Sequence, residues 1–239
     1  MSEVALVVLM RWPSPHAGKT RLAGDVGAAA ADRIHAAMVA DTLGWPEPRP
    51  RLLAVAGSRR ELRAASHAAP DAVVVPQPPG DLGQRIGAAL CAAIRGGAER
   101  AVVVGTDSPT LPGALVGDCL ELARPGVAGM VPARDGGFVA LSLHARDAGD
   151  GVIPWLTAGI PWSTELAAAA VRRTARGHGV TVLSTPPWFD VDRGADLPRL
   201  RRALLASPER APHTARCLAD LGIAGSALRA LRAELPTPG

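Results

Sequence analysis

The sequence predicts an α/β protein built on a mostly parallel sheet with helices on both faces. Over the first 105 residues, short apolar runs rich in Val alternate with longer segments of helical periodicity. Such alternation is typical of parallel sheets, because the crossover between two parallel strands needs a helix. With 239 residues, 48% of them hydrophobic, the chain is long enough to bury a large core.

The first part of the chain supplies four strands and three helices. The run 4–9 is apolar, contains β-branched residues and ends in a loop with Pro and Gly, as a buried strand does. In 26–43 the apolar residues recur at helical spacing, and Gly44 and Pro46 end that helix. Ser58 is the candidate N-cap of a helix that extends to about residue 67. The other elements expected here are strands at 52–56, 72–75 and 101–105 and a helix at 81–94.

Beyond Gly105 the alternation is less regular. A helix at 112–123 precedes two strands, 127–131 and 138–143, joined by an Asp-Gly-Gly segment typical of a hairpin. Ser163 is the candidate N-cap of the next helix. The elements expected after it are a helix at 163–176, a strand at 180–183, a helix at 195–205 and two short helical patterns within 209–231. We expect one domain, residues 1–208, with a C-terminal helical tail, residues 209–239, packed on it.

Composition and charge exclude several functional classes. The longest apolar runs are far shorter than the roughly 20 residues of a membrane span, and the N-terminus lacks a secretion-signal pattern. Three widely spaced cysteines without a Cys-x-x-Cys pair are typical of free thiols in a reducing cytoplasm. The arginines are spread along the chain and aromatic residues are scarce, which argues against nucleic acid. We therefore expect a cytoplasmic protein without nucleic-acid or membrane partners. Because its net charge is +4, we expect its ligand to be an anionic small molecule.

Lys19 is the only lysine among 26 basic residues. In so Arg-rich a chain, a retained Lys indicates a place where a compact, rotatable ammonium does what a guanidinium cannot. Gly18 lets a ligand approach the backbone, and Lys19 and Arg21 offer cations for phosphate oxygens. The segment is not a P-loop, because Pro13 stands where that motif requires a Gly. The alternative is a solvated basic loop.

Carboxylates follow two of the expected elements. Asp107 comes just after the strand 101–105, where it could hold Mg²⁺ or Mn²⁺ or could cap the helix that begins near residue 112. Asp190 and Asp192 would point to the same side of an extended segment and could complete a divalent site. Asp196 falls in a first helical turn, which favours a structural role.

Two further segments have both a structural and a functional interpretation. Asp135, Gly136 and Gly137 form a hairpin turn, but the two glycines also admit a ligand, whose hydroxyls Asp135 could receive. Ser163 and Thr164 begin a helix, and their hydroxyls with the helix amides could equally bind an acceptor or an anion.

Six short segments, in this order, resemble the bacterial DUF2064 family of glycosyltransferase-A-like transferases, some of which are labelled arsenosugar-biosynthesis glycosyltransferases. The segments are 18–22, 80–85, 105–109, 135–138, 161–164 and 190–192, within residues 4–205. The first loop is also similar to that of phospholactate guanylyltransferases, and the Asp107 loop to the metal site of molybdenum-cofactor nucleotidyltransferases. The chain departs from its family at Arg11, where Lys is more usual, and at Phe138, where Tyr is usual.

The resemblance implies a glycosyltransferase-A (Rossmann-like) fold with a nucleotide-handling site. Catalytic roles fall to Lys19, Asp107 and Asp135, and a metal, Mg²⁺ or Mn²⁺, to Asp107, Asp190 and Asp192. The nucleotide would be bound by Arg11, Gly18, Lys19, Thr20, Arg21, Gln84, Arg85 and Thr106. The acceptor would be bound by Gly136, Gly137, Trp162, Ser163 and Thr164.

Three functions follow as hypotheses. The first is glycosyl transfer from a nucleotide-diphosphosugar to a small acceptor, with the metal neutralising charge on the leaving diphosphate. The second is nucleotidyl transfer from an NTP to a phosphorylated substrate, which Lys19 and Arg21 suit because pyrophosphate needs cations beyond one metal. The third is a non-catalytic nucleotide-binding module, for which a metal clamp of two carboxylates has little use.

Overall fold

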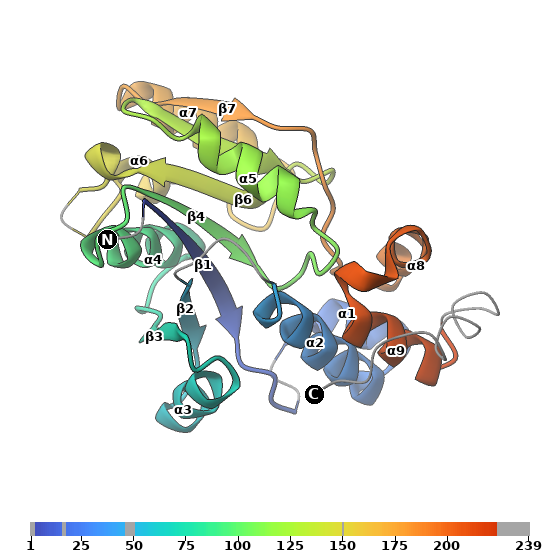
Figure 1. Cartoon of the computed structure of the whole chain (residues 1–239). Helices are drawn as coiled ribbons and strands as arrows, with labels where there is room; N and C mark the ends of the chain where they lie inside the picture. Colours follow the sequence, from blue (N-terminus) through green and yellow to red (C-terminus); the bar gives the residue numbers. More distant parts are fainter. Residues whose placement is uncertain (1–2, 16–17, 46–50, 150, 224–239) are drawn as a thin grey trace. The chain divides into compact units, whose positions relative to one another are not determined.

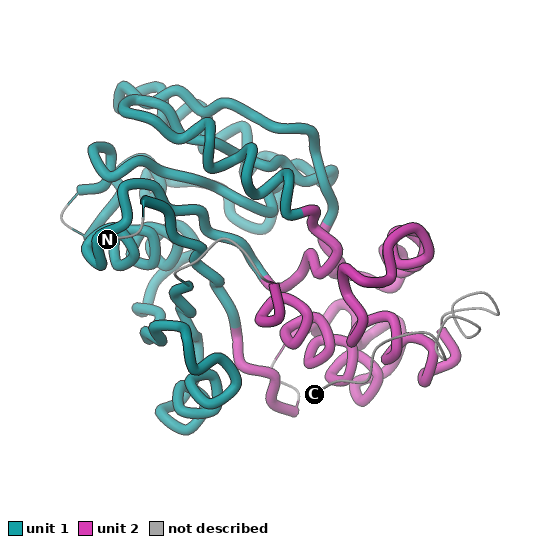
Figure 2. Tube along the Cα trace, in the orientation of Figure 1, with its two compact units in different colours: residues 1–10, 46–105, 113–189 teal, residues 11–45, 106–112, 190–239 magenta. Residues whose placement is uncertain are grey.

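A computed structural model describes residues 3–15, 18–45, 51–149 and 151–223 (Figure 1). The chain divides into two compact units, each made of segments distant in sequence (Figure 2). Unit 1 comprises residues 1–10, 46–105 and 113–189, and unit 2 comprises residues 11–45, 106–112 and 190–239. The domain boundary expected at residue 208 stays a prediction.

Unit 1 contains a seven-stranded sheet in the order β3-β2-β1-β4-β6-β5-β7. Its strands are β1 (Val4–Arg11), β2 (Arg51–Ala56), β3 (Ala72–Pro76), β4 (Arg100–Gly105), β5 (Val127–Pro132), β6 (Phe138–His144) and β7 (Thr181–Ser184). The pairs β1–β4, β2–β3 and β5–β7 are parallel, whereas β6 runs antiparallel to both of its neighbours. The predicted α/β class with a mostly parallel sheet is confirmed.

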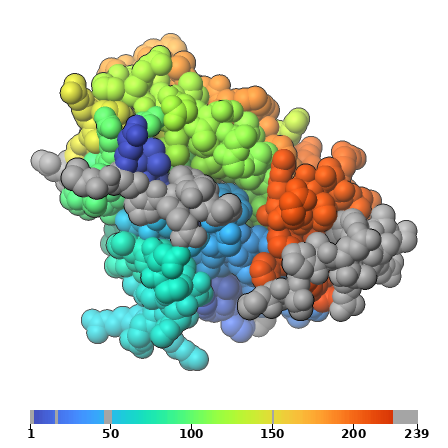
Figure 3. All heavy atoms as spheres, viewed as in Figure 1, coloured from blue at the N-terminus to red at the C-terminus, as the bar shows by residue number. Residues whose placement is uncertain are grey.

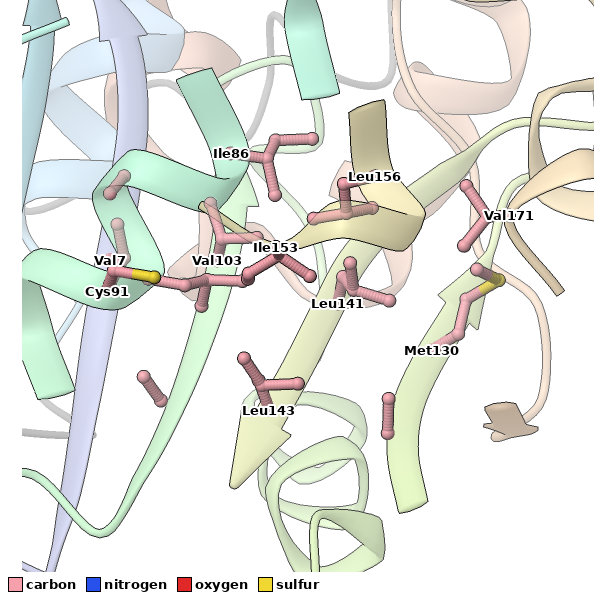
Figure 4. Close-up of a cluster of buried hydrophobic side chains, with 14 of the residues drawn as sticks. Val7, Ile86, Cys91, Val103, Met130, Leu141, Leu143, Ile153, Leu156 and Val171 are labelled. Carbon is pink, nitrogen blue, oxygen red and sulfur yellow. The ribbon is translucent and has the colours of Figure 1, made fainter. Parts of the chain in front are cut away.

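Helices cover both faces of this sheet. The unit contains α3 (Arg59–Ala68), α4 (Leu82–Arg95), α5 (Gly113–Leu122), α6 (Pro154–Thr157), α7 (Ala167–Gly177) and a 3₁₀ turn (Ala145–Asp147). On one face, Val103, Leu141 and Met130 pack with side chains of α4, α6 and α7, as Figure 4 shows. Because strand side chains alternate, the neighbouring strand residues face the opposite side, where α5 lies.

The contact between α5 and the sheet is close. Ser142 Oγ on β6 donates a hydrogen bond of 2.5 Å to the Cys119 carbonyl on α5. Burial raises the pKa of the Cys119 thiol to about 11, so this cysteine stays protonated and has a packing role. All three cysteines are free, as the sequence predicts, and all three are buried.

Two helices begin with reciprocal caps. Ser58 accepts from the Glu61 amide and Glu61 accepts from the Ser58 amide, which confirms Ser58 as the N-cap of α3. Asp81 and Gln84 form the same arrangement at the start of α4. Most side chains of α3, cyan in Figure 3, lie at the surface, whereas Ala65 is buried.

Gly83 lies in the first turn of α4, where the helix packs against α6. A Cβ at this position would lie 1.9 Å from the Leu156 carbonyl oxygen and 2.6 Å from Trp162 Cζ2. Gly83→Ala should therefore destabilise the protein by about 3 kcal/mol, because backbone must shift to relieve the overlap. Gly117, in α5, has nothing within 4 Å of the point that a Cβ would occupy, and Gly117→Ala should stabilise by about 0.5–1 kcal/mol. Urea unfolding of both variants measures the contrast; equal effects would contradict the packing argument.

Unit 2 is helical. It contains α1 (Thr20–Val26), α2 (Ala28–Leu43), α8 (Leu197–Ala206), α9 (Pro212–Asp220) and 3₁₀ turns at Gly194–Asp196 and Pro208–Arg210. The carboxylate of Asp41, on α2, accepts the amides of His213 and Thr214 at 2.9 and 2.8 Å and so caps α9. Part of the second helical pattern expected near the C-terminus lies outside the described residues. No helix in the described ranges is long and apolar enough to span a bilayer.

One predicted helix start is wrong, and another is displaced by two residues. The helix predicted over 26–43 is α2, which begins at Ala28 because Gly27, with φ of 87°, separates it from α1. The helix predicted from residue 163 begins at Ala167 instead. Ser163 is not its N-cap but a turn residue with φ of 63°, and Leu166 stands at the cap without a side-chain hydrogen bond. The helix α1 and the short α6 were not predicted.

Candidate functional site

Three segments of unit 2 come together around Lys19. One follows β1, one follows β4, and the third contains Asp190, Val191 and Asp192. The Val191 amide donates a hydrogen bond of 2.8 Å to the Asp107 carbonyl and so joins the second segment to the third. Residues predicted to bind phosphate and metal from the sequence thus belong to one compact unit.

Lys19 pairs directly with Asp107. Its Nζ lies 2.8 Å from Asp107 Oδ1 and also donates to the Val191 carbonyl. The Lys19 side chain is only 5% exposed, whereas that of Asp107 is 50% exposed. The carboxylate therefore offers a free side to a ligand while the ammonium is enclosed. Asp107 does not act as a helix cap in these contacts.

The backbone presents Lys19 at a helix start. Lys19 has φ of 55° and ψ of 36°, a left-handed conformation that is costly for a residue with a Cβ. Thr20 is the first residue of α1, exposed, so the basic motif opens a helix and is not wholly a loop. Arg11, the last residue of β1, is exposed as well, and Thr106 is buried.

A second ion pair is formed by Arg21, the second residue of α1. Arg21 Nη1 lies 2.8 Å from Asp192 Oδ2, with the two side chains 51% and 39% exposed. Asp196 accepts the amides of Asp192 and Arg193 at 3.0 and 2.8 Å, which shapes the turn that carries Asp192. Asp196 thus has the structural role expected of it, through backbone hydrogen bonds.

Sequence reasoning missed His35. It is a buried residue of α2, and a Cβ on Gly18 would lie 3.5 Å from its Cε1 and 3.8 Å from Arg11 Cδ. Burial lowers the pKa of His35, while the nearby charge of Asp107 raises it and that of Lys19 lowers it. A lone histidine on a helix has no pattern that marks it, so only the fold reveals its place beside the ion pair.

His35 makes stability depend on pH. Because its pKa is lower in the folded protein, the unfolded chain binds the proton more readily below the ordinary value near 6.5. The free energy of unfolding should therefore fall as pH drops below about 6.5. His35→Gln should flatten this fall in urea titrations between pH 7.5 and 5.5. His67→Gln, which removes an exposed histidine at the end of α3, is the control and should keep the wild-type slope; equal slopes for all three proteins would contradict the effect.

The carboxylates suit a hard cation. Asp107 and Asp192 are partly exposed oxygen donors on segments joined through Val191, and Mg²⁺ commonly binds one or two carboxylates together with substrate phosphates. Within the described ranges no three His, Cys, Asp or Glu side chains gather as a metal cluster, so Asp107, Asp190 and Asp192 do not form a three-ligand set. The donor set fits a metal that takes its other ligands from phosphate and water.

The nucleotide residues predicted in unit 1 lie on α4. Gln84 uses its side-chain oxygen in the cap with Asp81. Gly80, with φ of 120°, allows that cap, since a Cβ there would lie 2.0 Å from Gln84 Oε1. Arg85 Nε is buried and finds no hydrogen-bond partner in the described part of the chain. The helix cap therefore accounts for Gly80, Asp81 and Gln84 in this motif.

The predicted acceptor residues lie in two turns of unit 1. The hairpin between β5 and β6 is confirmed, and Asp135 accepts the Gly137 amide within it at 3.0 Å. A Cβ on Gly136 would lie 2.0 Å from the Glu165 carbonyl, and the Gly136 carbonyl accepts the Ala168 amide. The glycine therefore fits the start of α7 closely, while Asp135 remains exposed.

The second turn contains Trp162, Ser163 and Thr164. Trp162 meets Phe138 edge to face, with ring centroids 6.2 Å apart, and its Nε1 is buried without a partner among the described residues. Thr164 Oγ1 donates to the Pro161 carbonyl at 2.7 Å. Ser163 and Thr164 are both exposed. The structure thus brings together Trp162 and Phe138, which the sequence separates by 24 positions.

Known structures share this fold. A protein from Desulfovibrio desulfuricans G20, provisionally named a nucleotide-diphospho-sugar transferase, is 27% identical, with a TM-score of 0.81 over 96% of this chain and 98% of that one. A 4-diphosphocytidyl-2C-methyl-D-erythritol synthase is 13% identical, with a TM-score of 0.55 over 85% of this chain and 99% of that one. A cytidylyltransferase from Leptospira borgpetersenii is 14% identical, with a TM-score of 0.53 over 95% and 97%. No curated protein sequence matches the chain.

These similarities confirm the predicted glycosyltransferase-A-like fold, the sheet type of nucleotide-diphospho-sugar transferases. The sequence pattern of a family described as "uncharacterized protein conserved in bacteria (DUF2064)" matches residues 40–164, which is more than half of the chain. The chain therefore belongs to the DUF2064 family.

Proposed function

We propose that the protein is a nucleotide-dependent transferase, and specifically a metal-dependent glycosyltransferase that uses a nucleotide-diphosphosugar donor. The observation that carries the proposal is the Lys19–Asp107 pair, with Arg21–Asp192 beside it in the same unit. The similarity to the Desulfovibrio protein, through its name and the length of the match, supports the choice of donor.

In this proposal the two cations receive the diphosphate. Lys19 donates to a phosphate oxygen from an enclosed position, and Arg21 offers a forked guanidinium from a more open one. Asp107 and Asp192 would hold Mg²⁺ or Mn²⁺, which when bound would neutralise charge on the departing diphosphate. Arg11, Gly18, Thr20 and Thr106 would complete the nucleotide contacts, with Gln84 and Arg85 in their predicted roles.

The acceptor would be a small molecule with a hydroxyl group. Asp135 is exposed, so its carboxylate could orient that hydroxyl or remove its proton. Trp162, with Gly136, Gly137, Ser163 and Thr164, would contact the acceptor. Phe138 has no hydroxyl, so a Tyr hydroxyl at this position contributes nothing to acceptor binding here.

Nucleotidyl transfer is the second candidate. The observation that favours it is the pair of cations, Lys19 and Arg21, on a single turn of chain. A leaving pyrophosphate carries more charge than one metal neutralises, whereas the diphosphate of a nucleotide sugar needs fewer cations. A phosphorylated substrate would then attack the α-phosphate of an NTP.

Product analysis tests the proposal. The protein is incubated with Mg²⁺ or Mn²⁺, panels of nucleotide sugars or NTPs, and mixed hydroxyl and phosphorylated acceptors. Acceptor-dependent release of nucleoside diphosphate would support glycosyl transfer. Release of pyrophosphate would instead indicate nucleotidyl transfer. Nucleotide binding without turnover on any panel would favour a non-catalytic binding module and overturn the proposal.

A further inference from the structure

The ammonium of Lys19 already occupies one side of the carboxylate that the proposed metal needs. Two of its three N–H groups are directed to Asp107 Oδ1 and the Val191 carbonyl. Its side chain is 5% exposed, and a cation so enclosed depends on its anionic partner because water cannot replace it. Lys19 therefore holds Asp107 as its own counter-ion.

A divalent cation at Asp107 would compete with this pairing. It would place two further positive charges within a few ångströms of an enclosed ammonium, and repulsion between charges is strong where water is excluded. The competition ends once Lys19 gains a phosphate oxygen, which forms a charge-assisted hydrogen bond as short as the one to the carboxylate. The diphosphate thus replaces the anionic partner that Lys19 loses when a metal binds Asp107.

Arg21 competes much less with a metal for its own partner, Asp192. Its pair with Asp192 is about half exposed, so solvent and salt screen it and the arginine can turn away at little cost. The difference in exposure singles out Lys19 as the residue that controls metal entry.

We propose that Lys19 excludes a free divalent ion from Asp107 until a diphosphate arrives, so that the true substrate is the metal–nucleotide complex. This inference rests on the proposed function. It names the chemical form in which the nucleotide binds and assigns Lys19 a selecting role beyond contact with phosphate.

Equilibrium dialysis of Mn²⁺ tests the inference, with inorganic pyrophosphate as the diphosphate probe on both sides of the membrane. The wild-type protein should retain Mn²⁺ about tenfold more tightly with pyrophosphate than without it. Lys19→Met should bind Mn²⁺ alone about tenfold more tightly than wild type and gain little from pyrophosphate. Arg33→Met, which removes the same charge from a half-exposed pair with Asp220, is the matched control and should behave as wild type.

The outcomes separate this inference from the proposed function. If wild type binds Mn²⁺ equally well with and without pyrophosphate, or Lys19→Met gains no affinity, the selecting role is overturned. If Asp107→Asn also loses the pyrophosphate-dependent Mn²⁺, the proposed metal site still stands. If Asp107→Asn keeps it, the metal lies elsewhere and both ideas fail. The wild-type comparison needs no variant, so it can overturn the inference even where Lys19→Met does not fold.

Discussion

Asp107→Ala should abolish divalent-dependent nucleotide binding and lower turnover by roughly 10³-fold, while the fold persists. The carboxylate is half exposed and adjoins the segment that carries Asp192, so the substitution removes a metal ligand from a position open to the nucleotide. It also leaves the ammonium of Lys19 without its anionic partner. Because Lys19 is enclosed while Asp107 itself is half exposed, we expect a stability cost of about 3 kcal/mol, at the low end for a broken buried pair.

Calorimetric titration with a nucleoside diphosphate, with and without Mn²⁺, measures this effect. Asp118→Ala is the matched control, because Asp118 is an exposed carboxylate on α5 in the other unit. It should bind nucleotide as wild type does. Metal-dependent binding that survives in Asp107→Ala would show that another group holds the metal.

Lys19→Arg should lower turnover by about 10²-fold although the charge is kept. The ammonium fits an enclosed position between Asp107 and the Val191 carbonyl, and the side chain is 5% exposed. A guanidinium is larger and planar, so it cannot occupy that position without displacing one of its two partners. The loss should appear mainly in kcat if Lys19 contacts the departing phosphate most strongly in the transition state.

Steady-state kinetics on the substrates found by product analysis would measure the loss. Arg202→Lys provides the reverse exchange at an exposed position of α8 and should leave kcat and KM unchanged. Wild-type turnover in Lys19→Arg would mean that the single lysine of the chain is an accident of codon usage.

Much of the fold is predictable because local and tertiary preferences agree. A run of valines such as Val102–Val104 is typical of a buried strand, and these residues are buried in β4. Ser58 and Glu61 cap a helix through contacts between near neighbours in sequence. The order of strands is less accessible. It places β6 between β4 and β5, which depends on the pairing of residues far apart in sequence.

The errors have local physical causes. Gly27 and Ser163 both have positive φ, which a helix does not contain, so α2 and α7 begin later than the sequence pattern predicts. The helix α1 has seven residues, includes Gly24 and buries only Leu22, so its hydrophobic periodicity is too weak to predict a helix. For such segments the stabilising contacts come from elsewhere in the chain, as between Gly194 and Asp25.

The candidate site was predictable in part. The uniqueness of Lys19 and the position of Asp107 after a buried strand drew attention to both residues, and the structure joins them. The pairing of Arg21 with Asp192, 171 positions apart, and the place of His35 depend on the tertiary fold alone. The roles of Asp135 and Trp162 stay predictions.

A crystal structure of the protein with Mn²⁺ and a nucleoside diphosphate tests the central claim most directly. The anomalous signal of manganese locates the ion independently of the chain. We predict that an Asp107 carboxylate oxygen coordinates the ion and that Lys19 Nζ donates to a diphosphate oxygen in place of that carboxylate. A bound nucleotide and manganese that leave the Lys19–Asp107 pair intact would contradict it.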